Sequence, residues 1–188
     1  MPGLGEVAHA LYGSWRLARL DRGGMQYFDL SHRGVWRSFW SAALCYPGFL
    51  ILLFLRLDAA SLARSSIPHI VLVESIGYVI AWTAFPLLIL GLCRGLGREE
   101  AGFDFIVAYN WSQALQTGLL LVLALTLDRL LPQGAASGID LVAYLVLLAY
   151  EWFIALVAIG AGGWVAAAVV LVDVVLGSFV LAIAESLY

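Results

Sequence analysis

The sequence contains no lysine, and all ten of its basic residues are arginine. Charged residues of both signs make up only 12% of the 188 positions, whereas roughly a quarter is usual in a soluble domain. Hydrophobic residues make up 63%, and the mean hydropathy is +0.94. A soluble domain of this length cannot bury so much apolar surface, so lipid must serve as the outer solvent.

Cysteine and histidine are also scarce: the sequence contains two cysteines and three histidines. The two cysteines give neither a disulfide framework nor a metal-ligand spacing, and the histidines fall outside or at the rims of the apolar runs. We therefore predict no metal site and no cofactor. The sequence lacks a phosphate-binding glycine loop and a nucleophile with a histidine placed to activate it. We expect neither an enzyme nor a nucleic-acid partner.

Long apolar runs are what the chain does contain. A membrane-spanning helix needs about 20 mostly apolar residues, and five such runs lie at about 38–57, 68–93, 103–127, 139–159 and 164–187. We predict an all-α polytopic membrane protein, a bundle of about five transmembrane helices over residues 38–188. Residues 1–37 form a separate cytoplasmic or interfacial segment without a signal-peptide core.

The N-terminal segment is predicted to contain an amphipathic helix from Gly5 to Leu20, ended by a turn at residues 22–24. Asp29 or Ser31 can then cap the next helix. Arginine and tryptophan favour the headgroup region of a bilayer, although a short helix packed on the end of the first span stays an alternative. The predicted contacts with anionic lipid headgroups are Trp15, Arg16, Arg19, Arg22, Arg33, Trp36 and Arg37.

The arginines also predict the orientation. Seven lie before the first span or between the second and third spans, and three lie in the regions that face the other side. Because positive residues are retained in the cytoplasm, we expect a multi-pass protein of the bacterial inner (plasma) membrane. Its N-terminus would be cytoplasmic and its C-terminus periplasmic.

Polar side chains at membrane depth are candidates for a proton or ion pathway. Asn110 and Gln113 recur on one predicted helix face, and eleven residues, almost three full turns, separate Asp140 from Glu151. The estimated depth of Asp173 matches that of Glu151, near the bilayer centre. The complete set of pathway candidates is Glu74, Asn110, Gln113, Asp140, Tyr144, Glu151 and Asp173.

Neither arginine nor histidine shares the central depth, and an ionised carboxylate there costs a few kcal/mol or more. Two arrangements avoid this cost. The carboxyls are protonated and bonded to Asn110, Gln113, Tyr144 or Trp111, or they surround a cation or a hydrated cavity. Alternatively, the polar groups only hold helices together. A stripe of small residues with one acid favours such packing: Gly162, Ala166, Asp173, Gly177 and Ala184.

An arginine-bearing N-terminus precedes five closely spaced spans, and the stretches used for comparison are residues 28–31, 36–39, 106–111 and 150–155. This layout resembles the Yip1 superfamily of small five-span membrane proteins, and the stretches resemble uncharacterised alphaproteobacterial proteins placed near it. Asp29-Leu30 is followed by Ser31-His32, without the glycine-proline of the eukaryotic members. The resemblance implies partner binding rather than catalysis.

From these features we expect a non-enzymatic membrane protein that acts as a scaffold, an accessory subunit or a factor that binds lipids or partners. The alternative is a small proton- or cation-coupled transporter or channel that uses the central carboxylates. The expected partners are the bilayer, its anionic headgroups, and a membrane-protein partner or a second copy of the chain. A transporter should show a polar cavity at the midplane, whereas a scaffold should show these groups bonded and dry.

Overall fold

In the computed structural model, the backbone is described for residues 1–130 and 133–188, and the side chains for residues 1–126 and 137–188. The described residues form helices without a β-strand, which confirms the all-α prediction. In chain order the elements are α1 (Leu4–Ala18), the 3₁₀-helix η1 (Arg22–Tyr27), α2 (His32–Ser38), α3 (Trp40–Arg56), α4 (Ala59–Arg64), α5 (Ile67–Gly95), α6 (Glu99–Leu130), α7 (Gln133–Ile159) and α8 (Gly163–Ser186).

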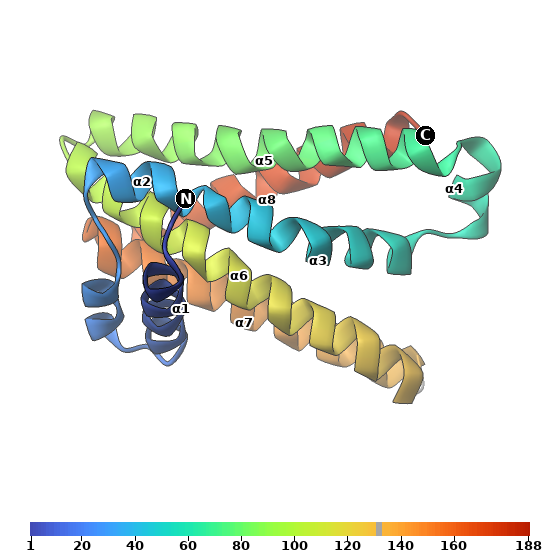
Figure 1. The fold of residues 1–188 in the computed structure, drawn as a ribbon, viewed down its shortest axis with the longest axis horizontal. Helices are drawn as coiled ribbons and strands as arrows, with labels where there is room; N and C mark the ends of the chain where they lie inside the picture. The colour runs from blue at the N-terminus through green and yellow to red at the C-terminus, as the bar shows by residue number, and fades with distance from the viewer. Residues whose placement is uncertain (131–132) are drawn as a thin grey trace.

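Five long helices, α3, α5, α6, α7 and α8, run alternately up and down the long axis of the molecule (Figure 1). One end of this bundle, which we call the α1 end, holds α1, η1, α2 and the turns that join α5 to α6 and α7 to α8. The opposite end, the α4 end, holds α4 and the C-terminus. The two ends are the surfaces that a membrane protein of this shape would present to water.

Four helical segments of the described part are long and apolar enough to cross a membrane: His32–Arg56, Ile67–Gly95, Ser137–Ile159 and Gly163–Ser186. They coincide with four of the predicted spans, and the chain is a helical membrane protein. The remaining predicted span, residues 103–127, lies within α6. This helix has 32 residues, about 48 Å at the usual helical rise, so it is long enough to cross but more polar.

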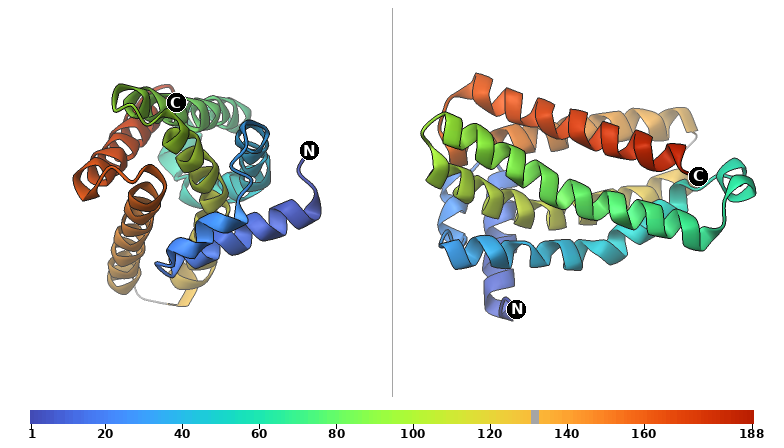
Figure 2. Two further views of the ribbon diagram at one scale, coloured as in Figure 1. Left: turned by 90° about the vertical axis from the view of Figure 1, so that its left-hand side faces the viewer. Right: turned by 90° about the horizontal axis from the view of Figure 1, so that it is seen from above.

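The polar side chains of helix α6 are tolerated because the helix lies inside the bundle. It packs against α1, α2, α3, α5 and α7, and it lies near the middle of the end-on view (Figure 2). Every residue from Phe105 to Ser112 is buried, a run of more than two turns that covers all sides of the helix. Protein rather than lipid therefore surrounds this part of α6, and its polar side chains can find partners there.

Helix α1 lies crosswise to the bundle at the α1 end (Figures 1 and 2). It packs on α6 and α7 through a buried face that includes Ser14 and Leu17. The predicted end of this helix was wrong: α1 ends at Ala18, and residues 22–27 form η1 instead of a simple turn. Leu20, with φ +59°, breaks the helical path, and the Asp21 carboxylate caps η1 by accepting from Gly23 N–H at 2.8 Å.

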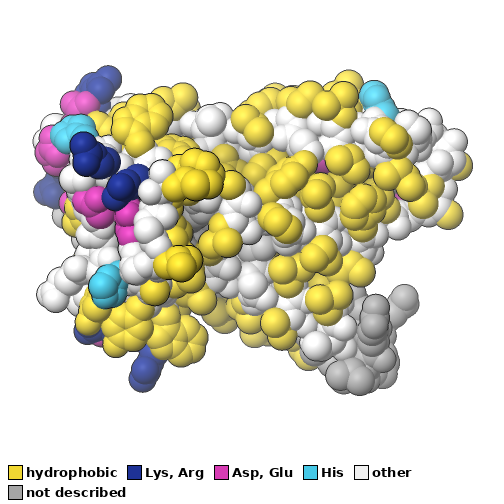
Figure 3. Space-filling view, in the orientation of Figure 1, with side chains coloured by type: hydrophobic (Ala, Val, Ile, Leu, Met, Phe, Trp, Pro, Cys, Tyr) yellow, Lys and Arg dark blue, Asp and Glu magenta, His cyan; other side chains and the backbone are white. Residues whose placement is uncertain are grey.

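Charged side chains gather at the α1 end (Figure 3). Arg56 and Arg64 are the only arginines at the α4 end among the described side chains, which do not include Arg129. Exposed tryptophans accompany the charges, with Trp36 78% and Trp164 92% exposed. The α1 end thus combines the residue types that favour a membrane–water boundary. Its arginines are Arg16, Arg19, Arg22, Arg33, Arg37, Arg94 and Arg98.

Close backbone contact holds η1 against α1. A Cβ atom added at Gly13 would lie 2.8 Å from the Gly24 carbonyl oxygen and 3.0 Å from Tyr27 Cβ. A Cβ atom added at Gly24 would lie 2.6 Å from the Gly13 carbonyl oxygen. Only glycine at both positions lets the two segments approach this closely, so the α1–η1 corner depends on this pair.

We predict that Gly13→Ala lowers the stability of the purified protein by about 1–3 kcal/mol, the usual cost of overpacking a close contact. The measurement is thermal unfolding in detergent, followed by circular dichroism. Gly5→Ala, in the same helix with open space around its Cβ position, is the matched control and should leave stability unchanged or slightly higher. Equal effects of the two substitutions would contradict the close contact.

Candidate functional site

Three helices bring a tyrosine and two carboxyl groups together in the middle of the bundle. The Tyr109 hydroxyl, on α6, donates a hydrogen bond of 3.0 Å to Asp173 Oδ1 on α8. The Glu151 carboxyl, on α7, lies beside that of Asp173. Glu151 is only 4% exposed. The structure therefore places the two predicted central acids side by side, and we call Glu151 and Asp173 the carboxyl pair.

The carboxyl pair has no positive partner in the described part of the chain. The four ion pairs found there involve neither Glu151 nor Asp173. Moreover, the buried Oε1 atom of Glu151 has no hydrogen-bond partner among the described residues. Two adjacent charges in such surroundings would repel each other and would lack solvation. A shared proton or a bound cation is the chemistry that removes this cost.

A cavity of about 140 Å³ adjoins the carboxyl pair between α5, α6 and α8. Its polar wall consists of Tyr109, Gln113 and Asp173, and Trp82 contributes an aromatic edge. A polar space of this size has room for several water molecules, because one water needs roughly 10–15 Å³ measured in this way. Of the carboxyl pair, Asp173 thus borders a space that small polar species can occupy, whereas Glu151 does not line it.

The predicted polar face of α6 divides among different neighbours. Asn110 is fully buried and donates from Nδ2 to Ser38 Oγ, at the end of α2, at 2.8 Å. Gln113 lines the cavity at α8, and Thr117 lines a separate hollow that includes Gly48 of α3. Because helices surround α6, side chains only 40–60° apart on it meet different partners.

Asp140 and Tyr144 lie in the same helix as Glu151, as predicted, but they do not belong to the site around the carboxyl pair. Asp140 is exposed and Tyr144 is 47% exposed, whereas Glu151 is buried. Toward the α4 end, α6 and α7 run away from α3, α5 and α8 (Figure 1). The face that meets α8 at Glu151 therefore has no covering helix near Asp140, and these two residues do not join the carboxyl pair.

Glu74 belongs to a separate cluster near the α4 end. Its Oε1 atom accepts from Arg56 Nη2 at 2.5 Å and from the Tyr188 hydroxyl at 2.7 Å. Burial, followed by the hydrogen bond to Glu74, raises the pKa of Tyr188 to about 12, so its hydroxyl keeps its proton at neutral pH. The buried Glu74 carboxylate is therefore compensated, and the structure separates it from the other pathway candidates.

The predicted headgroup contacts all lie at the α1 end. Trp15 is 52% exposed. Arg16 forms an ion pair with Asp21, and Arg37 forms one with Glu6 at 2.8 Å. Helix α1 packs on α6 and α7 rather than only on the end of the first span, and its outer face stays exposed. The exposed residues of the predicted set are Trp15, Arg19, Arg22, Arg33 and Trp36.

The small-residue stripe of α8 is only partly covered by the protein, since Gly162 and Gly177 are exposed. Ala166 is 1% and Ala184 4% exposed, and Gly177 lines the polar cavity. A Cβ atom added at Gly77 on α5 would lie 3.3 Å from Val180 and 4.0 Å from Ala184. Contacts with α5 and α7 within the same chain therefore occupy much of this stripe, which reduces its availability to a second copy.

Comparison with known proteins finds no matching family model, no matching curated protein and no matching solved structure.

Sequence reasoning missed three members of these clusters: Tyr109, Arg56 and Tyr188. Tyr109 precedes Gln113 by four residues, one helical turn, so the face that meets Asp173 could have been found by extending the polar stripe backward. Arg56 and Tyr188 lie at the ends of different helices. Only the fold brings them to Glu74, and no local spacing indicates this.

We predict that Arg56→Leu lowers stability by about 1–3 kcal/mol, because it leaves the buried Glu74 carboxylate without its cation. Arg56→Leu combined with Glu74→Leu should cost less than Arg56→Leu alone, since the double variant buries no uncompensated charge. Thermal unfolding in detergent measures both effects. Arg64→Leu, in α4 where no residue is buried, is the control with the same charge change. A double variant less stable than Arg56→Leu would contradict a compensating role for Arg56.

Proposed function

We propose that this protein is a small proton-coupled membrane transporter or channel, and that the carboxyl pair is its proton-binding site. The observation that carries the proposal is the position of Glu151 beside Asp173 without a positive partner in the described part of the chain. A monovalent cation is the alternative occupant of the same site.

Proton binding is the simplest chemistry for the pair. One proton shared between two carboxyls removes the repulsion between them and leaves a single charge, which the Tyr109 hydroxyl stabilises through its bond to Asp173. The cavity supports exchange of that proton with water, because Asp173 and Gln113 both line it.

We further propose that the α1 end faces the cytoplasm of a bacterial cell and that the protein resides in the inner membrane. The arginine distribution supports this orientation, since the positive residues gather at one end of the bundle. With five helices crossing in alternation, the C-terminus would then lie on the periplasmic side.

A scaffold or accessory-subunit role is the second candidate, in line with the partner-binding role that the resemblance to the Yip1 superfamily implies. The exposed, basic and aromatic outer face of α1 favours it, because Tyr12, Trp15 and Arg19 are free to contact another molecule. The α8 stripe supports this role less, because Ala166 and Ala184 are buried within the same chain.

For the proposed function, purified protein in liposomes that contain a pH-sensitive dye should dissipate an imposed pH gradient. Glu151→Gln and Asp173→Asn should each reduce the rate at least about tenfold, because a single remaining carboxyl cannot share a proton. Glu185→Gln, an exposed acid at the end of α8, is the control and should keep the rate of the unchanged chain.

The same liposomes separate the proposed occupants. Sodium or potassium flux lost in both variants, without proton flux in the unchanged chain, would assign the site to a cation. Folded protein that carries neither protons nor cations would overturn the proposed function and favour the scaffold role. Circular dichroism and the elution volume in detergent establish whether each variant is folded.

A further inference from the structure

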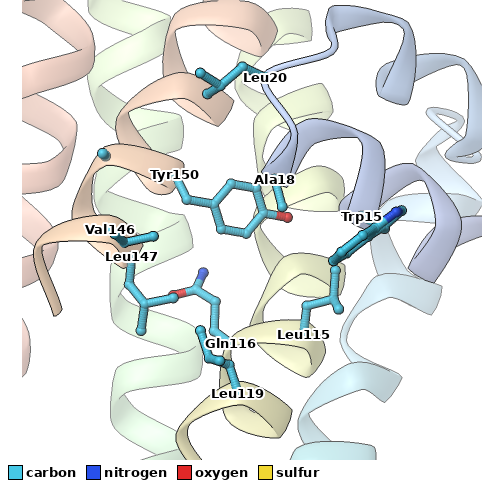
Figure 4. A pocket seen from close by; sticks show the side chains of 10 residues that line it. Trp15, Ala18, Leu20, Leu115, Gln116, Leu119, Val146, Leu147 and Tyr150 are labelled. Atoms are coloured by element: carbon cyan, nitrogen blue, oxygen red, sulfur yellow. The ribbon is translucent and has the colours of Figure 1, made fainter. Parts of the chain in front are cut away.

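An apolar groove of about 340 Å³ runs between α6 and α7 beside α1 (Figure 4). Figure 4 shows Leu20 at one end of this groove, Tyr150 in its middle and Leu119 at the other end. The groove is open to the surroundings of the bundle, and its walls are almost entirely hydrocarbon. The Tyr150 hydroxyl does not offer a free polar group, because it donates to the Ser14 carbonyl oxygen at 2.8 Å.

A second hollow, of about 480 Å³, lies on the outer side of α1 and has the opposite character. Trp15 lines both hollows, and the other residues of the second are Tyr12, Arg16, Arg19 and Asp21. A ligand that occupied both would pass over the Trp15 indole from a charged region to an apolar one.

The second hollow keeps a positive charge. The hydrogen bond from Arg16 holds the pKa of Asp21 below its ordinary value, so this carboxylate is ionised at neutral pH and balances Arg16. Arg19 forms no ion pair among the described residues and is exposed. Two guanidinium groups and one carboxylate thus leave this hollow with one net positive charge, and the hollow adjoins the apolar groove at Trp15. A guanidinium is well suited to bind a phosphate.

We infer that the two hollows together bind one anionic phospholipid, with its phosphate on Arg19 and Arg16 and one acyl chain in the groove between α6 and α7. The order of the wall matches the order of the lipid: charged groups, then the amphipathic Trp15 ring, then hydrocarbon. The position also matches, because α1 lies crosswise at the bundle end that carries the exposed tryptophans and most of the arginines.

This lipid site is independent of the proposed proton site. The groove faces α1, whereas the carboxyl pair faces α8 across the bundle, and neither Glu151 nor Asp173 lines the groove. Loss of lipid binding would therefore leave the proton proposal standing, and absence of proton flux would leave the lipid proposal standing.

Quenching of Trp15 fluorescence tests the site directly. The full chain is reconstituted into bilayers of ordinary phosphatidylcholine. Two series are prepared, one with increasing fractions of brominated phosphatidylglycerol and one with increasing fractions of brominated phosphatidylcholine. The difference between the unchanged chain and Trp15→Phe isolates the Trp15 signal. Brominated phosphatidylglycerol should reach half-maximal quenching at a mole fraction at least about threefold lower than brominated phosphatidylcholine.

Two variants with matched controls test where the lipid headgroup and the acyl chain bind. Arg19→Gln should abolish the preference for phosphatidylglycerol, whereas Arg33→Gln, which removes the same charge from an exposed position at the same end, should keep it. Ala149→Phe should fill the groove and reduce quenching by both lipids, whereas Ala182→Phe, exposed on α8, should not. The inference is overturned by equal quenching from the two lipids, by equal effects of the two arginine variants, or by an Ala149→Phe protein that is quenched normally.

Discussion

Helix α6 has to keep its polar side chains away from lipid, because hydrocarbon offers no partner for an amide or a hydroxyl group. Its position inside the bundle meets this requirement. Asn110 reaches the end of α2, Tyr109 reaches α8, and Thr117 faces α3. The other long helices are apolar enough to face lipid, and α3, α5 and α7 pack around α6 together with α1 and α2. The arrangement of the bundle follows from enclosing the one long helix that is least suited to the membrane.

The turn between α7 and α8 brings the two acids of the carboxyl pair to the same depth beside α6. Helices α7 and α8 are joined by a tight turn in which Gly160 and Gly162 have φ values of +64° and +98°. This turn keeps the first residues of α8 close to the last residues of α7. Glu151 precedes the turn and Asp173 follows it by similar lengths of helix, so the two acids reach the same depth. Tyr109 of α6 then completes the group.

The helices, and the shared depth of Glu151 and Asp173, could be predicted because both depend on counting residues along apolar runs. The contacts could not, since they depend on the angles between helices. Asp140 lies on the same stripe as Glu151, yet α7 leaves α8 before reaching it. The small residues of α8 predict close packing correctly, but nothing in their spacing distinguishes packing within the chain from packing against a second copy. The end of α1 was missed because Leu20 takes a backbone conformation that non-glycine residues seldom adopt.

Glu74 and Glu151 show how the fold distinguishes two similar residues. Both are glutamates inside long helices, and both are 4% exposed. Glu74 lies close enough to the α4 end for Arg56 to reach it while part of the arginine side chain stays exposed. Glu151 lies about as far from the end of its helix as Glu74 does, but no arginine of the described part forms an ion pair with it, and its neighbour is another acid. A buried carboxylate with a cation stabilises a structure and has little reason to change its charge. A buried carboxyl beside a second carboxyl has no cation to balance its charge, so the pair favours binding a proton. This difference makes the carboxyl pair, rather than Glu74, the candidate for function.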